Sequence, residues 1–355
     1  MHMADALVSP AVGAVMYTAS AAGLGYAGYK MKKSSESEKV LPLMAVAGAF
    51  VFAAQMINFT IPGTGSSGHI GGGILLAGLL GGGPALLAIA AVLMIQCLFF
   101  ADGGLLALGA NIFNMGVIPC LIVYPVIFRP LMKLAGKPGS ETLQGGESLS
   151  FRKGPMAAAV ILSTVAGLQL GAFGVVLETL ASGITELPFT AFVVLMQPVH
   201  LAIGLAEGVI TAAVFIYVNS IRPEILRAAL AGGSEERPGG FSVKKVVCVL
   251  AVLALLTGGG LSLVASQYPD GLEWSIEKVT GSTELEASDQ VHDAARAVQE
   301  RTAILPDYDF KDGEGRGTSL SGIAGAAMTC ILAAVAGGSV MLLKKRRSGD
   351  RETKH

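Results

Sequence analysis

The first two residues, Met1 and His2, carry nitrogen atoms in a spacing suited to binding a metal ion. The free terminal amine, the amide nitrogen of residue 2 and a ring nitrogen of His2 can close two fused chelate rings around one ion. Three nitrogens are then held in one plane with a fourth position open, a geometry that favours Ni(II) or Cu(II). Because the amine must lose its proton, affinity should fall at low pH. A chance histidine after the start methionine is the alternative interpretation.

His69 is the candidate for the fourth ligand. It follows a loop rich in glycine and serine, residues 62–68, and opens an apolar segment. Imidazole is a common ligand of nickel and copper. The competing interpretation is a loop histidine that faces water. Four other residues are candidates to orient the ligands, although polar residues at a membrane interface would give the same pattern: Asp5, Ser67, Asn111 and His200.

The remaining histidines and the cysteines carry weaker signals. His292 and His355 are expected to be solvated, and the four cysteines are expected to be small buried hydrophobic residues. Since the sequence contains no CxxC pair, it predicts neither a zinc site nor a redox pair.

The elements that must position these residues are apolar segments. The 355 residues are 52% hydrophobic and only 14% charged, whereas soluble domains carry about 25% charged residues. Nine apolar segments approach the ~20 residues that cross a bilayer: 10–29, 40–59, 69–82, 84–100, 110–133, 155–178, 189–219, 246–266 and 319–343. The short third segment is expected to be a broken or re-entrant helix inside the protein. The sequence predicts an all-α polytopic membrane protein with about nine transmembrane helices, seven in a core plus two.

Basic residues predict the orientation of these helices. The short connections 1–9, 60–68, 101–109 and 179–188 contain no lysine or arginine, whereas the alternate connections and the C-terminal tail are basic. This asymmetry predicts an N-terminus outside the cell and a cytoplasmic C-terminus. No basic stretch precedes the first apolar segment, so no cleavable signal peptide is expected.

The long polar segment 267–317 contains 12 acidic and 5 basic residues. It is expected to form a small extracytoplasmic lobe, with a helix over 284–301 whose apolar face carries Val291, Ala294, Ala295 and Val298. The predicted organisation is a metal-binding transmembrane core at 1–225, a cytoplasmic linker at 226–243, a module of two helices flanking the lobe at 244–345 and a basic tail at 346–355.

Two other functions fit parts of the sequence. Ser67 in a GxSG motif with His200 as a base would suit a rhomboid-like intramembrane protease. Glu207 and His200 could couple protons to metal movement in a stand-alone secondary transporter. Both stay open, and uptake by this chain alone would favour the second. The sequence contains no GxxxxGK[ST] motif, so this chain is not expected to hydrolyse ATP itself through a P-loop.

Several stretches resemble a known family. The opening MHMADALVSP, the triplet Ser67-Gly68-His69, FADGGLLALGANIFNM at 100–115 and PVHLAIGLAEG at 198–208 are similar to the CbiM/NikM-type nickel and cobalt substrate-binding (S) components of energy-coupling factor transporters. The motif PDGLEW at 269–274 resembles the PDGLE-type, or NikN-type, accessory component, here fused to the core.

The resemblance implies a transport subunit of a bacterial or archaeal cytoplasmic membrane, and not an enzyme. It implies a seven-helix core with metal held by the Met1 amine, the amide and ring of His2, and the ring of His69. The transported substrate would be Ni²⁺ or Co²⁺, with no organic cofactor and no nucleic acid. The implied partners are a transmembrane coupling protein (the T component) and two ABC-type ATPase subunits. Planar nitrogen ligation and the fused module favour nickel over cobalt.

Overall fold

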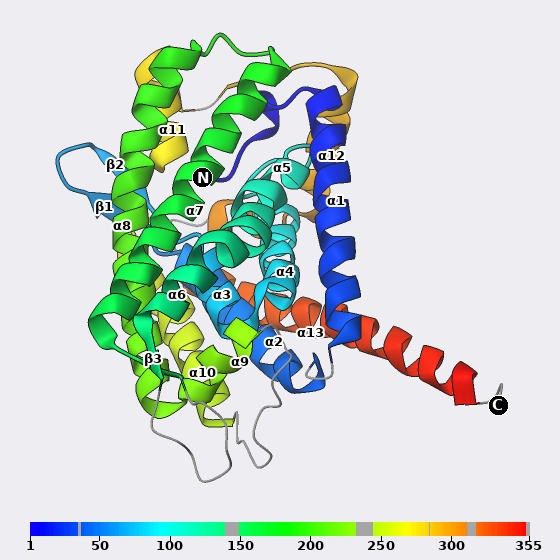
Figure 1. Cartoon of the computed structure of the whole chain (residues 1–355). Helices are drawn as coiled ribbons and strands as arrows, with labels where there is room; N and C mark the ends of the chain where they lie inside the picture. The colour runs from blue at the N-terminus through cyan, green and yellow to red at the C-terminus, as the bar shows by residue number, and fades with distance from the viewer. Residues whose placement is uncertain (35–36, 139–148, 232–243, 284, 311–316, 353–355) are drawn as a thin grey trace.

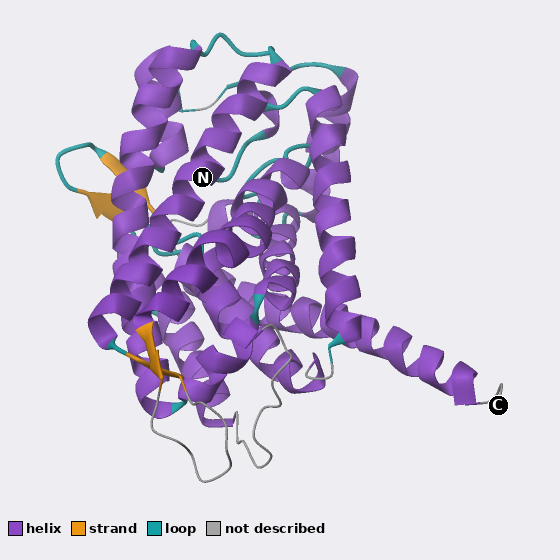
Figure 2. Ribbon diagram, viewed as in Figure 1, coloured by secondary structure: helices purple, strands orange, loops and turns teal. Residues whose placement is uncertain are grey.

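The computed structural model describes residues 1–355 except 35–36, 139–148, 232–243, 284, 311–316 and 353–355. Helices dominate the described chain (Figure 2). They are η1 (Asp5–Leu7), α1 (Pro10–Lys33), α2 (Ser37–Gln55), α3 (Gly73–Leu80), α4 (Gly82–Phe100), α5 (Leu108–Ile112), η2 (Phe113–Phe128), α6 (Arg129–Ala135), α7 (Lys153–Ser182), α8 (Phe189–Ile221), α9 (Pro223–Ala231), α10 (Lys244–Gly259), η3 (Leu261–Val264), α11 (Gly271–Thr280), α12 (Gln290–Thr302), η4 (Pro306–Tyr308) and α13 (Thr318–Glu352). Two short antiparallel hairpins pair β1 (Phe59–Ile61) with β2 (Ser66–Gly68), and β3 (Gly136–Pro138) with β4 (Leu149–Phe151).

The helices confirm the predicted class of an all-α, polytopic membrane protein. Each of the nine predicted apolar segments contains a helix. Five helical runs in the described chain are long and apolar enough to cross a membrane: 82–100, 108–135, 153–182, 189–221 and 318–344. The apolar parts of α2 and α10 are shorter, at Val40–Gln55 and Val246–Gly259. Helix α3 has only 8 residues and all of them are buried, as expected for a short helix inside the protein.

Local sequence explains where the helices begin and bend. Helix α1 starts at Pro10. Ser9 caps it, because the Ser9 Oγ accepts a hydrogen bond from the Val12 amide. Three lysines occupy its last turn, where positive charge offsets the helix dipole. Within the continuous run from α5 to α6, η2 is a wide π-helix that contains Pro119 and Pro125. Proline has no amide hydrogen to donate and disturbs regular α-helical bonding, and the sequence reading did not anticipate this element.

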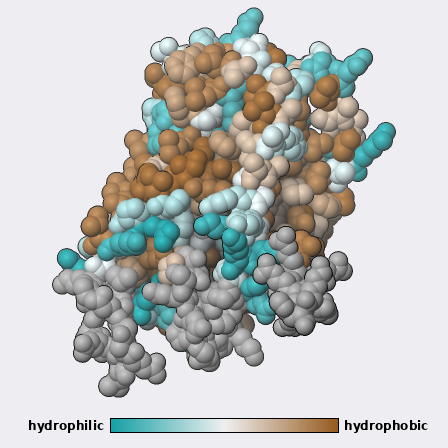
Figure 3. All heavy atoms as spheres, turned by 45° about the vertical axis from the view of Figure 1, so that its right-hand side comes forward, coloured by the Kyte–Doolittle hydropathy of each residue, from teal (hydrophilic) through white to brown (hydrophobic). Residues whose placement is uncertain are grey.

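The bundle has two polar ends and an apolar middle. Helices α7 and α8 run side by side and are joined by residues 183–188 at the end of the molecule that also carries α11 and α12 (Figure 1). We call this end the lobe face and residues 267–317 the acidic lobe. In the space-filling view, hydrophobic residues cover the middle of the visible face, with hydrophilic residues above and below (Figure 3). This banding is the one expected of a protein surrounded by lipid.

Four expectations differ from the structure. Residues 226–231, placed in the linker, belong to α9, which buries Leu226 and Leu230; residues 232–243 lie outside the described residues. In α12 the predicted apolar face is turned outward, with Val291 46% and Val298 47% exposed. His292 on the opposite face is buried and not solvated. Cys97 and Cys120 are buried as expected, but Cys248 is exposed. His355 lies outside the described residues.

Candidate metal centre

The N-terminal segment, residues 1–9, lies against the helix ends at the lobe face (Figure 1). Met3 is held in both directions by Asn111, whose Oδ1 accepts from the Met3 amide at 2.7 Å and whose Nδ2 donates to the Met3 carbonyl at 3.1 Å. The Gly104 amide donates to the same carbonyl at 2.9 Å. A side chain at Gly104 would overlap Asp5, so glycine permits this close approach. The segment is therefore fixed by the core and does not trail into solvent.

Asp5 contributes to the same attachment. Its Oδ1 accepts a hydrogen bond from the Ala107 amide at 3.0 Å. Burial raises the pKa of Asp5, although hydrogen bonds from backbone amides partly oppose this. Asp5 thus positions the segment and makes no recorded contact with His2 or His69.

Met1, His2 and His69, the three predicted ligand residues, lie together. The Met1 amine is 3.3 Å from Nε2 of His69, and the rings of His2 and His69 stack with centroids 5.1 Å apart. His69 follows β2, and its Nδ1 lies 3.0 Å from the Ile70 carbonyl. Because a carbonyl can only accept, Nδ1 carries the hydrogen and the lone pair of Nε2 faces the amine. Burial lowers the pKa of His69 and of His2, which favours the neutral rings that bind metals.

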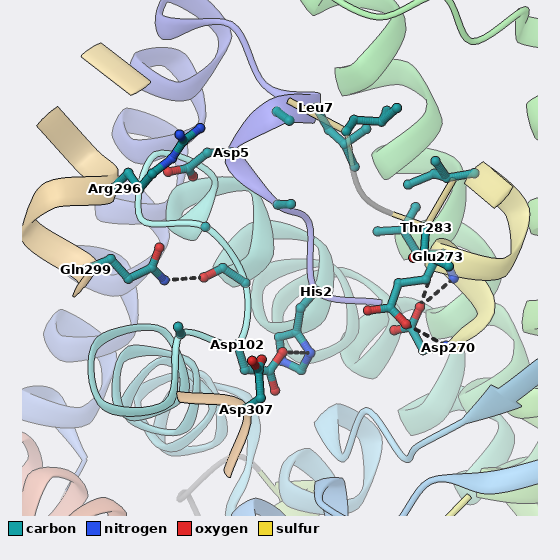
Figure 4. Close-up of a pocket in the computed structure, with 18 of the residues that line it drawn as sticks. His2, Asp5, Leu7, Asp102, Asp270, Glu273, Thr283, Arg296, Gln299 and Asp307 are labelled. Carbon is teal, nitrogen blue, oxygen red and sulfur yellow. Dashed lines mark hydrogen bonds and ion pairs between the residues drawn. The ribbon is translucent and has the colours of Figure 1, made fainter. Parts of the chain in front are cut away.

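The ring of His2 contacts two side chains of the core, Gln96 and Asp102, of which Asp102 is labelled in Figure 4. Nε2 lies 3.0 Å from Oε1 of Gln96 in α4, and Nδ1 lies 3.2 Å from Oδ1 of Asp102. Gln96 in turn donates to Gln55 of α2 at 2.8 Å. Amides on two helices and one carboxylate thus set the position of this ring.

Asp270 is the main residue of the centre that sequence reasoning missed. It comes from the acidic lobe, and its Oδ2 forms an ion pair with the Met1 amine. The same oxygen is 3.9 Å from Nε2 of His69. Burial alone would raise the pKa of Asp270. The adjacent terminal ammonium lowers this pKa by more than burial raises it, so the net shift is downward and the carboxyl group is ionised. The predicted topology placed the lobe and Met1 on one side of the membrane, which was the available signal.

Ser67 connects the loop that carries His69 to the acidic lobe. Its amide donates to the Pro269 carbonyl at 2.8 Å and its hydroxyl donates to the Tyr268 carbonyl at 2.7 Å. The indole Nε1 of Trp274 donates to the Thr64 carbonyl at 3.0 Å. The Ser67 hydroxyl therefore attaches β2 to the acidic lobe. Ser67 and His200 are not joined by a hydrogen bond, which a protease dyad would need.

Two residues of α8, His200 and Glu207, lie next to the candidate metal centre. Nδ1 of His200 is 2.8 Å from the Met196 carbonyl, and its Nε2 has no hydrogen-bond partner among the described residues. His200 lines a small cavity with Met1 and His69. The Glu207 carboxylate accepts from the amides of Gly71 and Gly72 at 2.7 and 2.9 Å. Glu207 therefore fixes the backbone just after His69.

A cavity of about 520 Å³ lies between the acidic lobe and the helix ends and reaches His2 and His69. Carboxylates dominate its charged lining, which comprises Asp5, Asp102, Asp270, Glu273 and Asp307 with Arg296 (Figure 4). A cavity of this charge attracts cations.

His292 attaches the lobe to the N-terminal segment. Its Nε2 lies 3.1 Å from the carbonyls of both Asp5 and Val8, and its Nδ1 lies 2.8 Å from the Asp289 carboxylate. These contacts explain why the apolar face of α12 is turned outward: the polar face is the one used for docking.

No three His, Cys, Asp or Glu side chains in the described chain are arranged to hold a metal ion by themselves. A metal bound here would need backbone nitrogens as well as rings, and the clustered amine and imidazoles supply that chemistry.

Comparison with known proteins identifies two matching families. A family model for the cobalt uptake substrate-specific transmembrane region, CbiM, matches residues 2–225, and a model of the PDGLE domain matches residues 244–343. The chain belongs to the CbiM family of nickel and cobalt transport proteins and carries a PDGLE domain. It is a multi-pass membrane transport protein and not an enzyme.

Individual relatives share this organisation. The fused nickel transport protein NikMN of Rhodobacter capsulatus is 29% identical over 98% of this chain and 100% of its own length. A protein of Archaeoglobus fulgidus, provisionally named fused nickel transport protein NikMN, is 33% identical over 72% of this chain and 76% of its own. The crystal structure of a truncated transition metal transporter is similar with a TM-score of 0.51 and 29% identity, over 62% of this chain and 99% of that one.

Proposed function

We propose that this chain is the substrate-binding component of an ATP-driven energy-coupling factor importer, and that it captures Ni²⁺ or Co²⁺ from outside the cell. One observation carries the proposal: the Met1 amine lies 3.3 Å from Nε2 of His69, with the His2 ring stacked on that of His69. The nickel transport names of the relatives support the same cargo.

Capture would use four nitrogens: the Met1 amine, the amide and Nδ1 of His2, and Nε2 of His69. In the metal-free chain Nδ1 of His2 faces Asp102 and the amine faces Asp270. Asp102 must therefore release Nδ1 as the metal binds, and the Met1 amine and the His2 amide must each lose a proton. Planar nitrogen coordination favours nickel over cobalt.

The distribution of basic residues supports an extracellular lobe face. Lys30, Lys32 and Lys33 end α1, Lys153 begins α7 and Lys344 follows the apolar part of α13. All of these lie at the ends of helices remote from the acidic lobe, as a cytoplasmic side requires. Energy would come from two ABC-type ATPase subunits through a transmembrane coupling protein. Within the chain, residues 1–225 would bind metal and residues 244–345 would support that core.

The decisive experiment alters the terminal amine. Two residues, Gly-Ser, are added ahead of Met1 in one variant and after His355 in a control. In cells that contain the coupling protein and ATPases, we expect the first variant to lose nickel and cobalt uptake and the control to keep it. Uptake retained by the first variant would rule out the amine as a ligand. Uptake by the unmodified chain in cells without those partners would instead favour a secondary transporter.

A further inference from the structure

Asp270 uses its two carboxylate oxygens for different tasks. Oδ1 accepts hydrogen bonds from the amides of Leu272 and Glu273 at 2.8 and 3.0 Å, and so caps the start of α11. The Glu273 side chain completes the capping box by accepting from the Asp270 amide at 2.9 Å. The other oxygen, Oδ2, is paired with the Met1 amine. The cap thus holds the carboxylate in one orientation, with Oδ2 pointing at the candidate metal centre.

This ion pair is shielded from water. The Met1 and Asp270 side chains are 8% and 14% exposed. A charge in such a position is strongly destabilising unless an opposite charge compensates it. A divalent cation bound to the same amine would also place positive charge beside Asp270. The carboxylate therefore has an electrostatic partner in the metal-free state and in the metal-bound state.

The same turn also holds the other ligand segment. The carbonyls of Tyr268 and Pro269 accept the two hydrogen bonds from Ser67, two residues before His69. Residues 268–270 thus contact both the N-terminal segment and strand β2. This turn is therefore the part of the acidic lobe that brings a carboxylate to the Met1 amine.

We propose that Asp270 is a positioning residue and the counter-ion of the metal centre: it holds the Met1 amine beside His69 and compensates the charge of the bound cation. This inference rests on the proposed function. It gives the C-terminal module a direct influence on metal affinity, although the module supplies no metal ligand. In the metal-free state Asp270 pairs with the terminal ammonium; in the metal-bound state the deprotonated amine donates a hydrogen bond to it, and Asp270 compensates the charge of the cation without coordinating it.

The variant Asp270→Asn separates the two tasks of the side chain. Asparagine caps helices about as well as aspartate, so its Oδ1 keeps the hydrogen bonds at the start of α11. Its Nδ2 then replaces Oδ2 and cannot pair with an ammonium or compensate a cation. Glu277→Gln is the matched control, because it removes one negative charge from the same helix at a residue that does not line the cavity.

The experiment measures nickel binding to the purified full chain by titration calorimetry with NiCl₂, together with the visible absorption of the bound ion. For Asp270→Asn we expect affinity at least about tenfold weaker, the size expected for the loss of one buried charged contact. The absorption spectrum at saturation should stay the same as that of the unmodified chain. For Glu277→Gln we expect affinity within about twofold of the unmodified chain, and for Asp270→Glu a value between those of Glu277→Gln and Asp270→Asn.

Each other outcome is informative. Unchanged affinity in Asp270→Asn, or a changed spectrum at saturation, would overturn the inference, the latter because it would make Asp270 a direct ligand. An unmodified chain that binds no nickel would instead overturn the proposed function. Trp274 is the single tryptophan and contacts the Thr64 carbonyl, so its fluorescence reports whether α11 stays docked in each variant. An undocked α11 in Asp270→Asn would mean that the cap failed. The comparison of Asp270→Glu with Glu277→Gln then decides, because equal affinities of these two variants would also overturn the inference.

Discussion

The N-terminal segment and the acidic lobe approach the candidate centre from opposite ends of the chain and differ in what they provide. The N-terminal segment carries the amine and the His2 ring, and amide side chains of the core hold it in place. The lobe contributes a carboxylate, backbone carbonyls and the imidazole of His292. One region therefore offers nitrogen donors to a cation, and the other offers negative charge and attachment.

This difference leads to an ordering of effects. Loss of a donor should weaken binding most, because it removes one of the four nitrogens that hold the metal. Loss of a contact that only positions a donor should weaken binding, because the remaining contacts still hold the segment. The predictions below test that ordering.

The largest effect is expected for His69→Ala. Removing its Nε2 leaves the Met1 amine without an imidazole neighbour from the loop, and nickel affinity should fall by at least roughly a hundredfold. Titration calorimetry on purified protein checks this. The control Thr64→Ala removes a hydroxyl from the same loop and should bind nickel normally. Stoichiometric, tight binding by His69→Ala would place the metal elsewhere.

As the pH falls, the stability contributed by the imidazole rings of His2 and His69 should be lost before the stability contributed by the carboxylate of Asp270. The pKa values of His2 and His69 are lowered from 6.5 by burial, so below about pH 6.5 the unfolded chain takes up protons that the folded chain does not. Stability contributed by these rings is present above pH 6.5 and is lost as the pH falls, by up to about 1.4 kcal/mol per pH unit for each ring. The pKa of Asp270 is lowered from 3.8, so its contribution is lost only below that pH.

Thermal unfolding followed by Trp274 fluorescence between pH 7.5 and 4.5 measures this loss. His69→Ala should show a shallower decline than the unmodified chain, since it lacks one of the two rings. Equal slopes would mean that His69 is not the buried neutral ring described above.

An intermediate effect is expected for Asn111→Ala. This change removes both hydrogen bonds to Met3, and nickel affinity should fall by about tenfold, a typical value for residues that orient ligands. Ser20→Ala is a suitable control, since its hydroxyl binds the Gly109 carbonyl away from the N-terminal segment. If both variants bind equally well, Asn111 does not position the amine.

The smallest effect is expected for His292→Ala. The ring attaches the lobe to the carbonyls of Asp5 and Val8, several residues from the donors, so nickel affinity should weaken only by about threefold. Val291→Ala changes the exposed neighbour and should have no effect. A loss as large as that of His69→Ala would show that the lobe is as essential as the donors, contrary to the ordering.

Much of the fold was predictable because membrane crossing requires long apolar segments. The nine segments and the buried short helix α3 follow from that requirement. The buried polar face of α12 was not predictable, since it depends on neighbours distant in sequence. The π-helix around Pro119 was not anticipated either, although the prolines that disturb it are local. In α12 the period of Val291 and Val298 indicated a buried face, but hydrogen bonds from His292 decided which face docks.

In the candidate centre, the grouping of Met1, His2 and His69 was anticipated from their chemistry and from charge topology. Asn111 and Ser67 were also anticipated near the site, and the structure shows what each holds: Met3 and the turn at 268–270. Asp270 was absent from that set. Its motif, Pro269-Asp270-Gly271, reads as an ordinary helix cap, and capping occupies only one of its two oxygens.

The sequence by itself determined that this chain is a helical membrane protein, which of its segments are apolar, and which nitrogen atoms could bind a cation, because hydropathy and donor chemistry are local properties of residues. Only the tertiary structure decided which carboxylate faces the terminal amine, 269 residues away. Such a pairing depends on how α11 docks against the β1–β2 loop and α8, and packing between distant segments leaves no periodic trace in a single sequence.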